Sequence, residues 1–279
     1  MVDLHTHSIF SDGSHTPEEL AAMGKAAGLS AVALTDHDTM AGLERFAAAC
    51  AGIGLKGIPG VEISADVVRG TMHILGYYAD PRCAALNMAL ERIRDGRSDR
   101  NGKILERLAS LGMPLSSEEV ARYAGDEVVG RPHVARAMVE KGYARSCEEA
   151  FEKYLAKGRP AYVDRFRLSP AESVRMIREA GGVAVLAHPF TLELDNGGLR
   201  RVLVGLKDDG LQGVEAYYSE HSPDQTRRYL ALAREIGLLV TGGSDFHGAV
   251  NPAIRLGIGF GNLRVPDDVL TALAAAAGR

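Results

Sequence analysis

The chain has 279 residues, 46% of them hydrophobic, and a formal net charge of −4. This length suits two ordinary domains or one α/β barrel, and the apolar content supports a sizeable core, which excludes a disordered chain. The negative net charge provides no general attraction to nucleic acid. Because a site with several bound cations still creates a local positive field, we expect a small anionic substrate.

Strand-like and helix-like patterns alternate in the first eighty residues. Val2–His7 is strand-like, and the segment TPEE at 16–19 predicts a helix start, since Thr caps a helix, Pro suits its first position and acidic residues suit its first turn. The elements predicted next are a strand at 31–35, a helix at about 41–51, and strands at 57–64 and 72–77.

Residues 82–159 break this alternation, because consecutive helices are predicted there without strands. Ser116 and Ser146 are each followed by acidic residues, which is typical of helix N-termini. The predicted helices are 86–111, a short one after Ser116, 132–141 and 146–155. We therefore expect a helical, substrate-capping insertion packed over the mouth of a barrel that residues 1–81 and 160–279 form.

The alternation returns in the last part of the chain. The predicted helices are 169–180, 199–207 and 223–236, and the predicted strands are 183–187, 213–217 and 238–241. This order predicts an α/β fold with a parallel sheet closed into a barrel. In such barrels, catalytic side chains come from the C-terminal ends of several strands.

Six of the nine histidines lie in short clusters at the ends of predicted strands. The clusters are DLHTH at 3–7, TDHD at 35–38, MH at 72–73, AHP at 187–189 and SDFH at 244–247. Alternate side chains of an extended strand share a face, so the two histidines of the first cluster can bind one ion together. Imidazole and carboxylate ligands without thiolate suit Zn, Mn or Fe.

The three cysteines are Cys50, Cys83 and Cys147, far apart and outside any C-x-x-C pattern. This spacing argues against a disulfide framework or a thiolate zinc site. No secretion signal precedes the first predicted strand, and no apolar run approaches membrane-spanning length. We expect a soluble cytoplasmic protein that contacts no membrane, and no pattern indicates an obligate protein partner.

The histidine clusters, together with SDG at 11–13 and GVEIS at 60–64, resemble the motifs of the polymerase and histidinol phosphatase (PHP) family. The resemblance covers nearly the whole predicted barrel, in order. It implies a distorted (β/α)7, TIM-like barrel that holds two or three divalent metal ions and hydrolyses phosphate esters. The ligand sets that it implies are His5, His7, Glu62 and Asp245 for a first ion, Glu62, His73 and His188 for a second, and Asp12, His37 and His247 for a third.

The expected chemistry agrees with these ligand sets. Two ions about 3.5–4 Å apart hold a bridging hydroxide and stabilise charge on the attacking and leaving oxygens. Glu62 suits the bridging place because a carboxylate has two oxygens, whereas an imidazole offers one free nitrogen at a time. We therefore predict Glu62, and His247 at the third ion, as catalytic. Asp3 and Asp36 are expected to orient ligating imidazoles.

The insertion carries a further resemblance, through GRPHVAR at 130–136 and KYLAKGRPAYV at 153–163, to a PHP subgroup that includes nucleoside 3′,5′-bisphosphate phosphatases. Arg131, His133 and Lys157 are the predicted phosphate contacts, since all three donate to phosphoryl oxygens. The alternative explanation of these three residues is ordinary surface charge and helix capping. The arginines between 92 and 107 alternate with acidic residues, which predicts a solvated helix face.

His221 lies in the segment SEHS at 219–222, directly after a predicted barrel strand. We predict it as a catalytic proton donor to the leaving group or as a substrate phosphate contact. A solvent-facing loop histidine is the alternative.

We expect a metal-dependent phosphoesterase with a water-derived nucleophile, since no G-x-S-x-G motif or cysteine among the ligands offers another. The preferred reaction converts a nucleoside 3′,5′-bisphosphate to the 5′-monophosphate and phosphate. A cyclic phosphate diester and the 5′ end of a short RNA are alternatives. A C–N amidohydrolase is an alternative of a different class. Such enzymes typically bridge their metals with a modified lysine, and Glu62 in that place argues against this alternative. A non-catalytic PHP binding domain is disfavoured by the intact ligand set.

Overall fold

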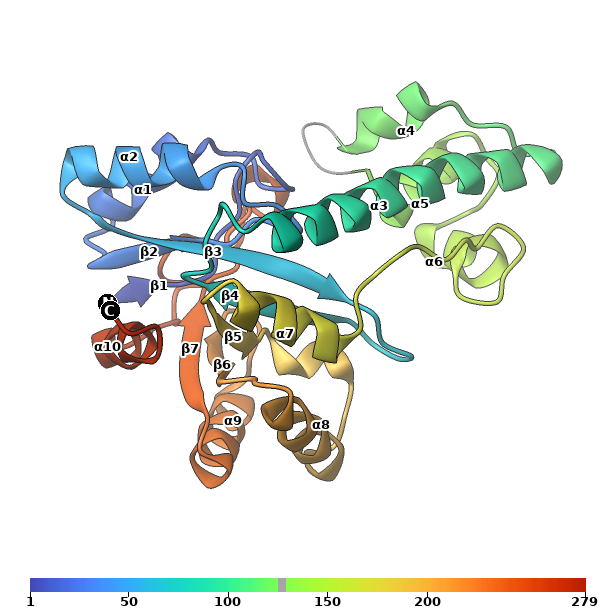
Figure 1. The fold of residues 1–279 in the computed structure, drawn as a ribbon. Helices are drawn as coiled ribbons and strands as arrows, with labels where there is room; N and C mark the ends of the chain where they lie inside the picture. The colour runs from blue at the N-terminus through green and yellow to red at the C-terminus, as the bar shows by residue number, and fades with distance from the viewer. Residues whose placement is uncertain (125–128) are drawn as a thin grey trace. The chain divides into compact units, whose positions relative to one another are not determined.

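The computed structural model describes residues 1–124 and 129–279 and divides into two compact units (Figure 1). The first unit comprises Met1–Leu90 and Leu168–Arg279, and the second comprises Glu91–Arg167. Helix α3, Ala84–Ser110, begins in the first unit and continues into the second. The predicted domain boundaries and the capping role of the insertion stay predictions.

The first unit is built on a seven-stranded sheet in which strands that are consecutive in sequence are neighbours in space. The strands are β1 (Val2–Asp3), β2 (Ala31–Leu34), β3 (Lys56–Ala65), β4 (Met72–Tyr77), β5 (Val183–Leu186), β6 (Gly213–Tyr218) and β7 (Leu239–Gly243). Its two edges meet, since the Leu4 amide donates to the Gly242 carbonyl at 3.1 Å and Thr6 forms a parallel bridge with Phe246. The nearly closed sheet confirms the predicted distorted barrel.

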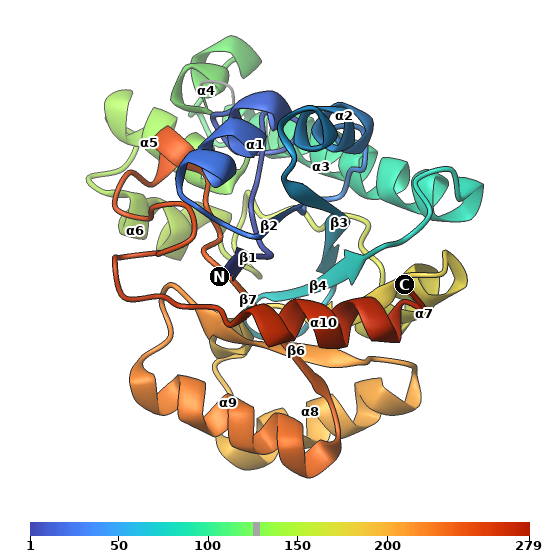
Figure 2. The ribbon, with the colours of Figure 1, turned by 90° about the vertical axis from the view of Figure 1, so that its left-hand side faces the viewer.

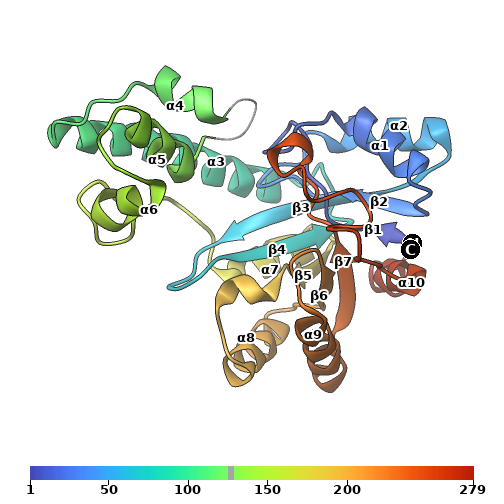
Figure 3. The same ribbon diagram turned by 180° about the vertical axis from the view of Figure 1, so that it is seen from behind.

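Strand β4 runs antiparallel to both of its neighbours, β3 and β5. The expectation of a wholly parallel sheet is therefore wrong at this strand. Strands β3 and β4 pair from Gly60 opposite Tyr77 to Ala65 opposite Met72, and residues 66–71 join them (Figure 3). Such a short connection makes a hairpin, whereas a crossover to a parallel strand needs about a dozen residues or more.

Capping boxes mark the starts of several helices of the barrel. Thr16, Ser169 and Ser222 each accept a hydrogen bond from the amide three residues on, in a capping box followed by proline. The helices are α1 (Pro17–Ala26), α2 (Leu43–Ile53), α7 (Pro170–Glu179), α8 (Asn196–Asp208), α9 (Pro223–Ile236) and α10 (Asp267–Ala276), with short 3-10 turns at Pro189–Leu192 and Gly248–Val250. The helix starts predicted at 16–19 and at 169 are confirmed.

Helix α10, which the sequence patterns do not predict, lies beside the start of β1 (Figure 2). Its Val269 and Leu273 belong to one buried apolar cluster with Val2 and Leu4 of the first strand segment. The N-terminal amine of Met1 also lies 2.7 Å from the Asp267 carboxylate at the start of the helix. Apolar burial therefore fills this end of the barrel and leaves the opposite mouth for polar side chains.

The second unit has its own apolar core, formed between helices. After α3, its helices are α4 (Ser117–Ala124), α5 (Arg131–Glu140) and α6 (Cys147–Ala150), which continues into a π-helical turn at Phe151–Leu155. The core contains Ile104 and Leu108 of α3 and Val134 and Met138 of α5. Among the described residues of both units, no helix is long and apolar enough to cross a membrane.

Candidate metal centre

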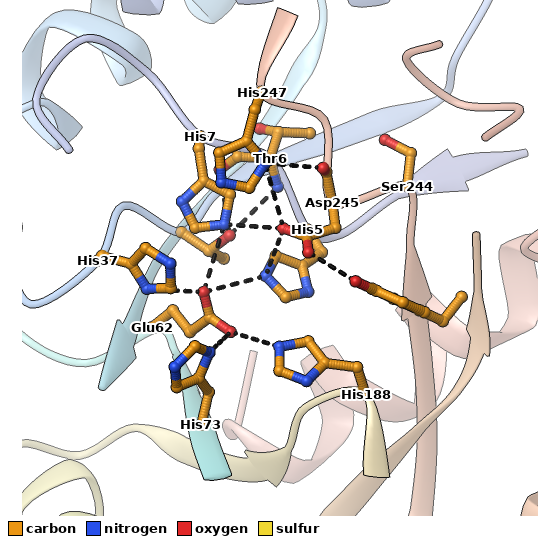
Figure 4. Close-up of polar contacts among 12 residues, drawn as sticks. His5, Thr6, His7, His37, Glu62, His73, His188, Ser244, Asp245 and His247 are labelled. Carbon is orange, nitrogen blue, oxygen red and sulfur yellow. Dashed lines mark hydrogen bonds and ion pairs between the residues drawn. The ribbon is translucent and has the colours of Figure 1, made fainter. Parts of the chain in front are cut away.

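The predicted metal ligands converge at one mouth of the barrel (Figure 4). They are His5, His7 and Asp12 after β1, His37 after β2, Glu62 in β3, His73 in β4, His188 after β5, and Asp245 and His247 after β7. His73 reaches this mouth from the start of its strand, because an antiparallel strand begins where its parallel neighbours end. The barrel thus collects side chains that are far apart in the sequence.

Glu62 lies at the centre of the cluster and is fully buried. Its Oε2 contacts His5 Nε2 and His7 Nε2 at 3.3 Å and His37 Nδ1 at 2.9 Å, and its Oε1 contacts His73 Nδ1 and His188 Nε2 at 2.9 Å. The two oxygens of one carboxylate therefore face separate sets of imidazoles. This division is what a bridge between two ions requires.

Several buried polar atoms of these ligands have no hydrogen-bond partner. They are His5 Nε2, His7 Nε2, Asp12 Oδ1, His37 Nδ1, Glu62 Oε2 and Asp245 Oδ1. Some approach one another closely, as His37 Nδ1 and Glu62 Oε2 do at 2.9 Å, but without the angles of a hydrogen bond. Each such atom costs about 1–3 kcal/mol when left unpaired. The donor set, nitrogen and oxygen only, fits divalent metal ions that would supply the missing interactions.

Among the described residues, three groups of donors are compact enough to hold an ion, with donor atoms within 4.8 Å of one another. The groups are His5, His7, Glu62 and Asp245; His7, Asp12, His37 and His247; and His37, Glu62 and His73. The first group is the set predicted for a first ion. In the last group, His37 accompanies Glu62 and His73, whereas the prediction for the second ion places His188 there. The assignment of each residue to an ion stays a prediction.

The buried carboxylates change the proton affinity of the rings. Burial lowers the pKa of His7, but Asp245 and Glu62 outweigh burial and raise this pKa to about 10. Burial lowers the pKa of His73 to about 4, although Glu62 opposes that shift. Burial raises the pKa of Asp245, but His5, His247 and His7 outweigh it and hold this pKa well below its usual value. At neutral pH the metal-free centre therefore has a protonated His7 beside ionised carboxylates.

Metal binding is expected to release protons and to strengthen as pH rises. The His7 ring holds a proton below its pKa of about 10, and a metal ion binds only a neutral imidazole. Apparent manganese affinity should rise about tenfold per pH unit for each proton released, over about pH 6.5 to 8.5. Calorimetric titrations of metal-stripped protein in buffers of different ionisation enthalpy measure the proton count. Affinity that does not change with pH would contradict this expectation.

Asp3 and Asp36 do not orient imidazole rings as expected; they hold the loops that carry the ligands. Asp36 accepts hydrogen bonds from the Ser8 amide, the Ser8 hydroxyl and the Ser11 hydroxyl, each at 2.7 Å. Asp3 accepts from the Ser244 amide and hydroxyl and from main-chain amides that include His5. The expectation was wrong because serine hydroxyls and main-chain amides of the neighbouring loops occupy both carboxylates.

Glu215, which the sequence patterns missed, is a carboxylate outside the predicted ligand set that contacts the ring of a predicted ligand. It is fully buried in β6, and its Oε1 lies 3.0 Å from His5 Nδ1. A charged residue in the middle of the apolar strand Gly213–Tyr218 was a usable signal, because glutamate is rarely buried without a partner. Tyr218 of the same strand donates its hydroxyl hydrogen to Asp245 Oδ2 at 2.8 Å.

His221 lies beside the ligand cluster but outside it. Its ring contacts Tyr218, whose ring in turn contacts His188. Its Nδ1 lies 3.0 Å from the Ala216 carbonyl and donates to it, and its Nε2 is buried without a hydrogen-bond partner. Burial lowers the pKa of His221, which keeps the ring neutral at pH 7. Its predicted catalytic and phosphate-binding roles stay predictions, and a neutral ring is a poor proton donor.

The predicted phosphate contacts Arg131, His133 and Lys157 all belong to the second unit. Arg131 donates from Nη1 to the Leu155 carbonyl at 3.2 Å. His133 Nδ1 accepts from the Gly130 amide at 3.0 Å, so this ring caps helix α5. Lys157 is exposed. Their phosphate contacts stay predictions.

The arginine run of helix α3 is not wholly a solvated face. Arg100 is only 6% exposed, and its guanidinium donates to the Asn101 side chain at 2.9 Å. Burial, together with the nearby charge of Arg131, lowers the pKa of Arg100 to about 10. The expectation of a solvated face is therefore wrong at Arg100, where positive charges gather inside the second unit.

A distorted barrel with clustered histidine and carboxylate side chains at its mouth defines a metal-dependent hydrolase. The PHP domain family model matches residues 3–154, and the chain belongs to the PHP family. PHP phosphoesterases depend on metal ions, and this chain has the clustered groups to bind them. The chain is therefore a phosphoesterase of the hydrolase class, as predicted.

Curated relatives cover most of the chain. A 3′,5′-nucleoside bisphosphate phosphatase of Chromobacterium violaceum is 36% identical over 88% of this chain and 87% of its own length. The 5′-3′ exoribonuclease Rnm of Salmonella typhimurium is 35% identical over 91% of this chain and 87% of its own. A phosphoribosyl 1,2-cyclic phosphate 1,2-diphosphodiesterase of Eggerthella lenta is 32% identical over 88% and 94%.

Solved structures with the same fold match both units. A protein of Bifidobacterium adolescentis assigned as a metal-dependent phosphoesterase has a TM-score of 0.79 at 31% identity, covering 100% of this chain and 98% of its own. A protein of Chromobacterium violaceum described as an amidohydrolase with bound sulfate and no metal has a TM-score of 0.81 at 33% identity, covering 99% and 96%.

Proposed function

We propose that this chain hydrolyses nucleoside 3′,5′-bisphosphates to nucleoside 5′-monophosphates and inorganic phosphate, with two or three divalent ions (Mn, Zn or Fe) bound at the barrel mouth. The observation that carries the metal chemistry is the position of the Glu62 carboxylate. Its two oxygens face different sets of imidazoles at 2.9–3.3 Å. This arrangement suits a bridged pair of ions and a phosphoryl substrate. The similarity to the Chromobacterium violaceum phosphatase supports the choice of substrate.

Bound ions would supply an activated water as nucleophile and neutralise charge on the phosphoryl oxygens. The residues of the chain organise that site. Glu62 faces both imidazole sets, and Asp245 faces His5 and His7 at 3.3 and 3.1 Å. The oxygen of the water forms a bond to phosphorus, the P–O3′ bond breaks, and O3′ leaves with a proton. The products are the 5′-monophosphate and inorganic phosphate.

An RNA with a 5′-phosphate is the main alternative, because its first linkage presents the same P–O3′ bond beside a 5′-phosphate. The two substrates differ only in what else is bonded to that phosphorus. The charge of the second unit favours both substrates, because Glu91–Arg167 contains sixteen basic and thirteen acidic residues, whereas the whole chain has a net charge of −4. A local excess of positive charge attracts polyphosphorylated ligands. The exoribonuclease relative supports this second candidate.

Hydrolysis of a cyclic phosphate diester is the remaining phosphoesterase alternative, supported by the Eggerthella lenta relative. Ring opening and hydrolysis of the resulting monoester would each need an activated water, which ions held by the clustered donor groups would supply. An amidohydrolase reaction is less well supported, although one structural relative carries that name. The bridging place holds the carboxylate of Glu62 rather than a modified lysine, and bound sulfate in that relative resembles phosphate in shape and charge.

The test compares kcat/KM for four substrates with one manganese-loaded preparation. These are adenosine 3′,5′-bisphosphate, adenosine 3′-monophosphate, a 5′-phosphorylated diadenylate and ribose 1,2-cyclic phosphate. The proposal expects the bisphosphate to be hydrolysed best and loss of its 5′-phosphate to reduce kcat/KM. Preference for the dinucleotide would favour the exoribonuclease, and preference for the cyclic diester would favour that alternative. Metal retained without hydrolysis of any ester would indicate a binding domain.

Arg131→Ala is expected to raise KM for the bisphosphate about ten- to hundredfold with little change in kcat. The predicted contact to a substrate phosphate is charge-assisted, and its loss costs about 1.5–3 kcal/mol if it is equal in the ground and transition states. Steady-state kinetics measure this. The matched control is Arg136→Ala, an exposed arginine of the same helix, which removes the same charge. Equal effects of both variants would contradict a specific contact.

A further inference from the structure

Glu215 touches two predicted metal ligands with its two carboxylate oxygens. Oε1 lies 3.0 Å from Nδ1 of His5, and Oε2 accepts a hydrogen bond from the main-chain amide of His188 at 2.8 Å. The residue is 0% exposed and sits at a shift in the pairing of β6 with β7, between Glu215 and Tyr217. Such local irregularities re-aim side chains in strands next to active sites. One buried carboxylate therefore holds both ligands.

The contact with His5 decides which ring nitrogen is free. A carboxylate only accepts hydrogen bonds, so Nδ1 of His5 carries the hydrogen and donates it to Glu215. In the neutral ring, Nε2 then has the lone pair. That Nε2 lies 3.3 Å from Glu62 Oε2 and 3.3 Å from Asp245 Oδ1, inside the first group of donors.

The contact with His188 acts on the main chain. His188 has φ 21° and ψ 66°, outside the regions that residues other than glycine favour. Such a conformation costs about 1–3 kcal/mol and persists only where its surroundings hold it. The hydrogen bond from its amide to Glu215 is one such restraint. The same conformation places His188 Nε2 2.9 Å from Glu62 Oε1, on the other side of the predicted bridge.

We propose that Glu215 is a positioning residue that presents His5 and His188 to opposite oxygens of Glu62 and thereby couples the binding of the first and second metal ions. This inference rests on the proposed metal centre, since it assumes that both rings bind metal. It predicts that one substitution outside the ligand set weakens more than one ion site. Groups that orient metal ligands typically contribute about ten- to hundredfold to metal affinity.

Glu215→Gln tests this with little change of shape. The amide oxygen can still accept from the His188 amide, but the NH2 group then faces His5 Nδ1 and donates to it. His5 would move its hydrogen to Nε2 and lose its free lone pair toward Glu62. Manganese titration of metal-stripped protein, followed by electron paramagnetic resonance, is expected to show about ten- to hundredfold weaker binding at more than one site. Nitrogen-15 NMR of the histidine rings in zinc-loaded protein, which is diamagnetic, reports which nitrogen of His5 carries the hydrogen.

The matched control is Asp36→Asn, which makes the same change at a buried carboxylate whose partners are the Ser8 amide and the hydroxyls of Ser8 and Ser11. It is expected to lose stability in thermal unfolding but to keep the His5 tautomer. If Glu215→Gln does not fold, Glu215→Asp keeps the charge but is one methylene shorter and should lose one of the two contacts. Wild-type manganese affinity and stoichiometry in the folded variant would overturn the role of Glu215. Failure of the wild-type protein to bind manganese, zinc and iron alike would overturn the metal centre as well.

Discussion

Glu62→Gln is expected to lower kcat for the bisphosphate at least about a thousandfold, equivalent to about 4 kcal/mol of transition-state stabilisation. The amide keeps one oxygen and replaces the other with an NH2 group, which cannot bind a metal ion. One of the two imidazole sets that Glu62 now faces would therefore lose its shared ligand. Steady-state kinetics, with metal content measured by mass spectrometry, test this expectation.

The control for this substitution is Glu44→Gln on helix α2, where the side chain is exposed. It makes the same chemical change away from the barrel mouth and should leave both kcat and metal content unaltered. If folded Glu62→Gln keeps wild-type turnover and metal content, Glu62 does not bridge two metal ions. Far-UV circular dichroism of the metal-free variants separates loss of metal from loss of fold.

Asp245→Asn is expected to abolish turnover and to remove the first ion. Asp245 Oδ1 lies 3.3 Å from His5 Nε2 and 3.1 Å from His7 Nε2, so its carboxylate completes the first donor group. Its φ of 57° lies in the left-handed region, which asparagine tolerates better than alanine. Asp245→Ala should also abolish turnover, with an added loss of stability. Phosphate release and manganese titration measure the two effects.

Tyr218→Phe provides the matched comparison for Asp245. It removes only the hydroxyl group that donates to Oδ2 at 2.8 Å and leaves Oδ1 facing the two rings. We expect it to keep the first ion and to reduce activity by less than tenfold. Full activity in Asp245→Asn, or equal losses in both variants, would refute the assignment of Asp245 as a ligand.

Local chemistry made much of the fold predictable. Three helix starts are marked by a capping box and a proline, at Thr16, Ser169 and Ser222. These signals are local, because each depends only on residues within one helical turn. Strands such as Val183–Leu186 are short apolar runs, which the alternating pattern locates. Helix α10 was missed although its acidic first turn and its alanine-rich sequence favour a helix; its N-cap, Pro266, makes no side-chain capping bond that would mark the start.

The histidine-rich segments were also visible in the sequence, because each pairs metal-ligand residue types with a strand end. Their convergence follows from barrel topology, which brings the ends of parallel strands to one mouth. The antiparallel direction of β4 was also predictable from the sequence, because residues 66–71 are too few for a crossover to a parallel strand. What the pattern could not supply was which ring faces which oxygen of Glu62.

The sequence alone determined the barrel class, the ligand types and the family resemblance, because periodicity, caps and motifs are properties of neighbouring residues. Only the tertiary structure decided that Glu215, 210 residues from His5, contacts that ring, that Asp3 and Asp36 hold loops instead, and that Arg100 is buried. These contacts depend on strand register and on packing between distant segments. A one-residue change of register would turn each strand side chain to the other face of the sheet.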